Sequence, residues 1–328
     1  MSTTNPLVSK MLVLDARDEQ LPSLSRVCDE QNVIGIVVRN EDLASALAEH
    51  TDLGAVLLAG DYDGTSAASE AIAALRPELP VILQQRGGGQ PAALPQLRGT
   101  WVADDPESLR SALDRHVFGV EFPDALVDGI VEITTTRLRS LFPALEVEAG
   151  PPSIVRDRII FGEVLSLIPL EGSWCRGYML MQAEEEPLIT TLGSASVRER
   201  DAEAASGGPA NGGPANGGPA DFRELNSVLG ELTNLVWGAF KNRFLSAPAA
   251  SMQSVVQVPL LINHRHRYIS FGSDNPQLCF RYRLSRAGAA RDVVIDQRFV
   301  FSLNWSPEDF DDRGEPDDSP AFGEIDLF

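Results

Sequence analysis

The chain has little cysteine, few aromatic residues and few positive charges for its 328 residues. Its three cysteines are scattered and form no Cys-x-x-Cys pair, which excludes a disulfide framework and gives no zinc-site spacing. Lysine and arginine total 27 against 47 aspartates and glutamates, and the net charge of -20 argues against binding to nucleic acid or to an anionic membrane surface.

Long hydrophobic runs are also missing. No apolar stretch approaches the ~20 residues that span a bilayer, and the N-terminus lacks the charged-then-apolar form of a signal peptide. We therefore expect a cytoplasmic protein without a membrane segment. The 43% hydrophobic content is enough for two ordinary cores.

The segment 227–241 predicts one helix with two different faces. Ser227, Glu231 and Asn234 are spaced at i, i+4 and i+7, so they form a single polar ridge. Apolar residues at the helical period, Leu235 among them, are predicted to face a core. Gly238 lies within the helix, where glycine costs about 1 kcal/mol relative to alanine. Its presence favours a surface that another molecule approaches closely, and the alternative is a solvated polar stripe.

This ridge, followed by Pro259, resembles the signature of the CheC/CheX/FliY phosphatases of bacterial chemotaxis, and the stretch 230–241 is most similar to CheX. The resemblance covers roughly residues 120–303 and implies an α+β CheX/CheC-like domain. It implies that Glu231 forms an ion pair with the invariant lysine of a phosphorylated CheY-type receiver. It also implies that Asn234 orients a water in line with the aspartyl phosphate, while Ser227 and Gly238 contact the substrate.

The residue types suit that chemistry. An amide donates and accepts hydrogen bonds and stays neutral beside an incoming phosphate. Because an acyl phosphate is reactive by itself, we expect no cofactor or metal of the chain's own, and the Mg²⁺ would come with the receiver. The competing function is a non-catalytic adaptor or switch component that binds receivers. The presence of both Glu231 and Asn234 favours the enzyme, and the resemblance to CheX further implies a homodimer.

Residues 1–117 predict an α/β doubly wound parallel sheet, because five β-rich runs alternate with helix-patterned segments. The strands are expected at 11–15, 33–38, 55–59, 80–84 and 100–102, and the helices at about 18–30, 41–50, 66–76 and 106–116.

This alternation resembles the receiver domain of response regulators, but the catalytic residues differ. Ala59 stands where the phosphoacceptor aspartate is expected, although a slipped alignment would bring in Asp61 or Asp63. Asp104 and its neighbours replace the expected lysine. We interpret the segment as a pseudo-receiver that neither takes up phosphate nor switches by it.

The second half, 120–303, is predicted to begin with a helix at 122–142, followed by a hairpin of 164–172 with 175–183 and a short helix at 184–192. Further β-rich runs follow from residue 254. In the first helix, Asp128, Glu132 and Thr135 repeat the spacing of the ridge, with threonine in place of asparagine. We interpret this repeat as a relic of internal pseudo-symmetry without activity, and the alternative is coincidence.

Two segments are predicted to be disordered. Nearly three copies of a Gly-Gly-Pro-Ala-Asn repeat lie within 195–220, an insertion before the ridge helix. The acidic tail 304–328 ends in a cluster at 321–328 where apolar residues return, and its last five residues are Glu324, Ile325, Asp326, Leu327 and Phe328. This cluster resembles the CheY-binding segment of FliM and suggests a docking peptide. A sliding-clamp motif and a merely solubilising tail stay open as alternatives.

Overall fold

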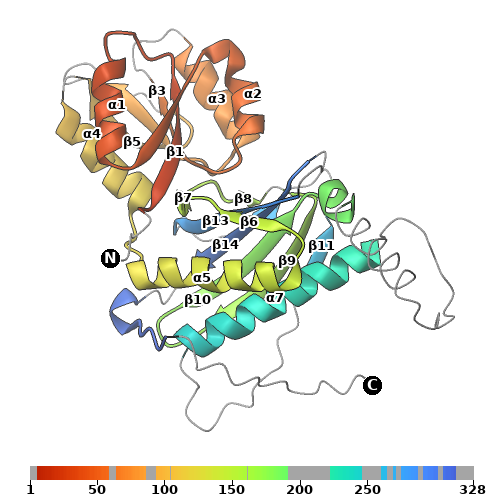
Figure 1. Cartoon of the computed structure of the whole chain (residues 1–328). Coiled ribbons are helices and arrows are strands. Elements are labelled where there is room, and N and C mark those ends of the chain that lie inside the picture. The colour runs from red at the N-terminus through yellow and green to blue at the C-terminus, as the bar shows by residue number, and fades with distance from the viewer. Residues whose placement is uncertain are drawn as a thin grey trace, which may run out of the picture.

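The structure is a computed structural model. It describes residues 6–58, 64–85, 94–103, 105–160, 162–190, 222–245, 260–263, 269–270, 275–286, 291–301 and 306–314. The described strands form one mixed sheet of 12 strands and a separate two-stranded pair, with helices on the faces of the large sheet (Figure 1). A mixed α and β architecture is what the sequence predicts.

The N-terminal part of this sheet is entirely parallel. Its strands are β1 (Val8–Leu14), β2 (Val33–Val38), β3 (Leu53–Leu58), β4 (Val81–Gln85) and β5 (Leu97–Val102). They lie in the order β2-β1-β3-β4-β5, the flavodoxin-like order of doubly wound sheets. The central strand β3 is buried along its whole length, as expected for a strand covered on both faces.

Helices cover both faces of this parallel part. One core lies under α1 (Leu21–Glu30) and α4 (Pro106–Leu113), and a second lies under α2 (Leu43–Glu49) and α3 (Thr65–Leu75). Short helical turns, η1 (Asn40–Asp42) and η2 (Asp114–Phe118), adjoin α2 and α4. The parallel α/β sheet that the sequence predicts is therefore present. Its assignment as a pseudo-receiver stays a prediction, and Asp61 and Asp63 lie outside the described residues.

The C-terminal part is a mainly antiparallel sheet that carries two long helices. The strands are β6 (Glu146–Ala149), β9 (Val164–Glu171), β10 (Arg176–Ala183), β11 (Leu260–Asn263), β13 (Gln277–Ser285) and β14 (Val293–Phe301). They follow the order β11-β9-β10-β14-β13, with β6 also paired to β13. The predicted hairpin is β9 with β10, which pair in register from Glu171 and Arg176 outward. Residues 185–190 form the start of the predicted short helix.

The two long helices, α5 (Asp124–Leu141) and α7 (Phe222–Phe244), lie side by side across one face of this sheet (Figure 1). Aromatic residues hold the C-terminal half of α7. Phe240 lies 5.3 Å from Phe299 of β14 between ring centroids, and the indole nitrogen of Trp174 donates to the carbonyl of Phe244 at 2.8 Å. A long, fixed helix with one buried face results.

A three-residue strand joins the two parts of the sheet. β7 (Ser153–Val155) pairs in parallel with β1 and antiparallel with β13. Just beyond it, Asp157 is completely buried and forms an ion pair with Arg76, which also donates to backbone carbonyls of the α2 region. Arg298 of β14 donates to the carbonyl of Thr51 at 3.2 Å. The chain's predicted division into 1–117, 120–303 and 304–328 stays a prediction, and the sheet is continuous across its first boundary.

Two small strands, β8 (Ile159–Ile160) and β12 (Ile269–Ser270), form the separate pair, and η3 (Pro307–Asp309) follows β14. All three cysteines are free and buried. Burial raises the pKa of Cys28 to about 11 and of Cys175 and Cys279 to about 12, so the thiols behave as core residues. Within the described ranges, no helix has the length and apolarity to cross a bilayer.

Candidate functional site

The predicted polar ridge lies on the exposed face of α7. Ser227, Glu231 and Asn234 are all exposed, whereas the opposite face is buried against the sheet. The buried residues of the helix share its apolar stripe: Leu225, Leu229, Leu232, Val236, Trp237, Phe240 and Phe244. A single buried hydroxyl in that stripe, on Thr233, donates to the carbonyl of Leu229 at 2.7 Å and so has a partner.

The ridge side chains are available to another molecule. Within the part of the chain that the structure describes, neither the carboxylate of Glu231 nor the amide of Asn234 has a hydrogen-bond or ion-pair partner. They lie three positions apart on a regular helix, so both project from the same face about one turn apart. A free carboxylate and a free amide at this spacing can engage two points on one partner surface.

Next to the ridge, the helix surface has a position without a side chain, Gly238, and an exposed apolar residue, Leu235. A Cβ added to Gly238 would have nothing within 4 Å, and helical periodicity places Gly238 on the same face as Asn234. Leu235, which the sequence predicts to face the core, is 38% exposed, so that prediction is wrong. Leu235 lies at the border between the two faces, about 100° around the helix from Asn234. It adds an apolar contact point that the hydrophobic pattern alone misassigns.

The repeated spacing on α5 has a different environment. Glu132 accepts a hydrogen bond from Arg243 of α7 at 2.8 Å, and Asp128 is only partly exposed. The hydroxyl oxygen of Thr135 is buried and has no hydrogen-bond partner among the described residues. The position that corresponds to Glu231 is therefore paired and the position that corresponds to Asn234 is buried, so α5 does not repeat the exposed carboxylate and amide of α7.

Arg243 also ties the start of the acidic tail to the helices. Its guanidinium donates to both carboxylate oxygens of Asp312, at 2.8 and 3.0 Å, and this hydrogen bonding holds the pKa of Asp312 below its usual value. Phe310 packs edge-on against Trp174 at 5.2 Å between centroids. The described residues 306–314 are thus fastened beside the C-terminal end of α7.

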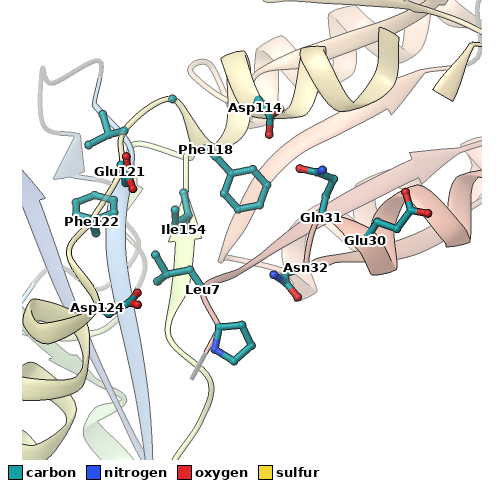
Figure 2. Close-up of a pocket in the computed structure, with 13 residues that line it drawn as sticks. Leu7, Glu30, Gln31, Asn32, Asp114, Phe118, Glu121, Phe122, Asp124 and Ile154 are labelled. Carbon is teal, nitrogen blue, oxygen red and sulfur yellow. The ribbon is translucent and has the colours of Figure 1, made fainter. Parts of the chain in front are cut away.

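Two crevices in the described part of the chain lie away from the ridge. A crevice of about 700 Å³ lies where the N-terminal end of β1 meets the chain entering α5, with Leu7 and Phe118 inside and Asp114 and Asp124 at its rim (Figure 2). A second, of about 480 Å³, lies against β5 and α4. No ridge residue lines either crevice. An exposed helix face of this kind suits docking against another macromolecule.

Several predicted positions fall outside the described residues. These are Pro259, the insertion 195–220 and the docking-peptide residues Glu324, Ile325, Asp326, Leu327 and Phe328. Among the described residues, no group of three or more His, Cys, Asp or Glu side chains is arranged to hold a metal ion. The expectation that the chain has no metal of its own stays a prediction.

No protein-family model matches this chain, and no curated protein matches it. The solved structures that match include CheX- and CheC-like proteins. They include CheX from Desulfovibrio desulfuricans (13% identity, TM-score 0.36, covering 54% of this chain and 99% of that one). They also include a CheC-like protein from a Shewanella species (20%, 0.34, 53% and 97%). A third is a CheX–CheY complex with BeF₃ and Mg²⁺ from Borrelia burgdorferi (13%, 0.30, 54% and 97%). These identities and scores are too low to transfer an activity to this chain.

Proposed function

We propose that this protein is a phosphatase that removes the phosphoryl group from the aspartyl phosphate of a CheY-type response regulator in chemotaxis or motility signalling. The observation that carries the proposal is the exposed pair Glu231 and Asn234 on α7, which has no partner among the residues that the structure describes. The other face of this helix fixes it to the sheet. The residue types and their spacing match the family signature that the sequence resembles.

Each ridge residue has a role that its chemistry allows. The Glu231 carboxylate pairs with a lysine of the receiver and fixes the register of docking. The Asn234 amide holds a water in line with the phosphorus–oxygen bond, and attack releases inorganic phosphate and the free aspartate. Ser227 and Gly238 flank the contact, and the open space over Gly238 admits the receiver backbone. The Mg²⁺ belongs to the substrate.

The same proposal includes the parts of the chain around the site. The N-terminal unit acts as a pseudo-receiver that does not depend on phosphorylation, and the peptide 324–328 tethers the substrate and raises its local concentration. The protein works in the cytoplasm as a homodimer. Each of these rests on the sequence alone, whereas the proposal for the catalytic pair is also supported by the exposure of both side chains.

The test is the decay of the acyl phosphate on a phosphorylated CheY-type receiver. Wild-type protein should accelerate the decay, and Asn234→Ala should lower the rate by on the order of 100-fold while receiver binding persists. Asn40→Ala is the control, because Asn40 is an exposed asparagine of η1, in the parallel part of the molecule away from α7. Receiver binding without any acceleration by the wild type would replace the enzyme with the adaptor function.

A further inference from the structure

A basic crevice lies on the parallel part of the molecule, away from the α7 ridge. It has a volume of about 480 Å³ between β5 and the helical segment of α4 and η2. Its polar lining combines cations and hydroxyls: Arg98, Thr100, Ser108, Ser111, Arg115 and His116. No carboxylate lines it, although the chain as a whole carries a net charge of -20. Such a concentration of one sign against the overall charge makes the crevice attractive to anions.

The arginines in and beside this crevice disfavour the protonated form of their basic neighbours. Burial, followed by the charges of Arg115, Arg156 and Arg98, lowers the pKa of His116. Arg156 adjoins the group, and burial together with Arg158 and Arg98 lowers its pKa to about 10. Positive charges held at this proximity are stabilised when an anion binds between them.

The backbone is shaped to hold these side chains in place. A Cβ on Gly99 would lie 2.5 Å from Cδ2 of His116, so glycine is needed for the imidazole to lie against β5. The Nε of Arg156 donates to the carbonyl of Val117 at 2.8 Å, which fixes its guanidinium beside η2. Gly119, with φ of +38°, follows η2 and leaves room for that guanidinium.

Two arginines of the crevice are available to bind an anion. Arg98 and Arg115 are exposed, and in the described part of the chain neither has an ion pair or a side-chain hydrogen bond. Two neighbouring acidic residues are engaged elsewhere: Glu107 pairs with Arg110, and Asp105 caps α4 by accepting a hydrogen bond from the Glu107 N–H at 3.1 Å. Asp114, next to Arg115 in the chain, lines the other crevice.

We propose that this crevice binds a small phosphate-bearing molecule, held by Arg98, Arg115 and His116. Guanidinium groups match phosphate oxygens two at a time, and a phosphate carries the double charge that several neighbouring cations favour. The hydroxyl of Ser111 and the side chain of Thr100 offer further polar contacts, and the volume accommodates a mononucleotide. The site is independent of the ridge on α7 and of the phosphatase proposal.

The experiment measures binding of inorganic phosphate and of ADP to the full chain by calorimetry, for the wild type, for Arg98→Gln/Arg115→Gln and for Arg39→Gln/Arg283→Gln. The control pair removes the same charge from exposed arginines that lie outside the crevice. The first double variant should weaken binding by about tenfold or more, and the control should leave it within about twofold. Equal losses in the two variants, or no binding of either probe to the wild type, would overturn the site.

Nuclear magnetic resonance of His116 gives a second readout. Its resonance is assigned with His116→Gln. Phosphate binding should raise the pKa of His116, because the anion offsets the charges of Arg98, Arg115 and Arg156 that surround it. An unchanged titration of His116 under saturating phosphate would place the anion elsewhere and refute the assignment. Decay of receiver acyl phosphate should be the same in the Arg98/Arg115 variant and the wild type, which separates this site from the catalytic one.

Discussion

Helices α5 and α7 carry the same polar spacing, lie side by side on one sheet and have opposite surroundings. On α7 the carboxylate of Glu231 and the amide of Asn234 are exposed and have no partner in the described ranges of the chain. On α5 the corresponding carboxylate, Glu132, is paired with Arg243, and the hydroxyl of Thr135 is buried. Spacing therefore decides which side chains share a face, whereas the neighbouring elements decide whether that face is free.

The closure of the α5 face comes from α7 itself. Arg243, in the last turn of α7, reaches Glu132, and Phe244 packs where α5 has Gly129. A Cβ at Gly129 would lie 2.6 Å from Cζ of Phe244, so only glycine permits this close approach. The C-terminal end of α7 therefore occupies part of the corresponding face of α5.

The largest difference between the two helices is expected in receiver binding, when the charge of Glu231 on α7 or of Glu132 on α5 is reversed. In the proposed docking mode, Glu231→Arg would place a cation opposite the lysine of the receiver, and we expect binding to a phosphorylated receiver to weaken by on the order of 100-fold. Glu132→Arg should leave binding within about twofold. The measurement is titration of the receiver against each variant, followed by fluorescence anisotropy.

Glu132→Arg, the control variant, should also have a small effect on stability. Glu132→Arg breaks the ion pair with Arg243. Because the Glu132 side chain is 55% exposed, the free energy of unfolding should fall by about 1 kcal/mol or less. Equal loss of receiver binding in both variants would show that the α5 face is also part of the docking surface.

Alanine at the two glycines should have opposite effects on stability. Gly129→Ala forces the Cβ into Phe244 and should lower the free energy of unfolding by about 1–3 kcal/mol. Gly238→Ala enters open space and should raise it by about 0.5–1 kcal/mol, because alanine favours the helix. Urea denaturation of both variants provides the measurement. Destabilisation by Gly238→Ala would contradict the open surface over the ridge.

The sequence was informative where local pattern determines structure. The strand 33–38 was predicted with its observed limits, because a continuous apolar run between turn residues is typical of a parallel strand. The polar face of α7 was predicted from the helical period. Leu235 was misassigned since it lies at the edge between faces, where hydrophobicity alone favours the core although the neighbouring packing ends there.

Long-range contacts carried no such signal. β7 is three residues long, too short for an alternating pattern, and its role depends on pairing with β1 and β13 from distant parts of the chain. The pairing of Glu132 with Arg243 spans 111 positions in the sequence. Whether a predicted ridge is exposed or covered depends on such contacts. The spacing in the sequence therefore identifies both ridges but does not predict that Arg243 pairs with the α5 ridge.

A smaller effect should follow from the buried hydroxyl on α5. Thr135→Val keeps the side-chain shape and removes a polar atom that has no partner, so the free energy of unfolding should rise by about 1 kcal/mol. Thr134→Val is the matched control: its hydroxyl donates to Oε1 of Gln297 at 3.0 Å, and its loss should destabilise by a similar amount. A loss of receiver dephosphorylation in Thr135→Val, with stability retained, would give α5 a catalytic role.

The smallest effect should come from Asp312, which shares Arg243 with Glu132. Hydrogen bonding to Arg243 lowers the pKa of Asp312 in the folded state, so its contribution to stability is present above the unfolded-state pKa and is lost as the pH falls through the folded-state value. Asp312→Asn should therefore cost at most about 1 kcal/mol at pH 7. The difference from wild type should shrink as the pH falls below 3.8, the ordinary pKa of an aspartate. Urea titrations of both proteins from pH 7 to pH 3 would detect this convergence, and a difference that stays constant with pH would assign the contact to packing rather than charge.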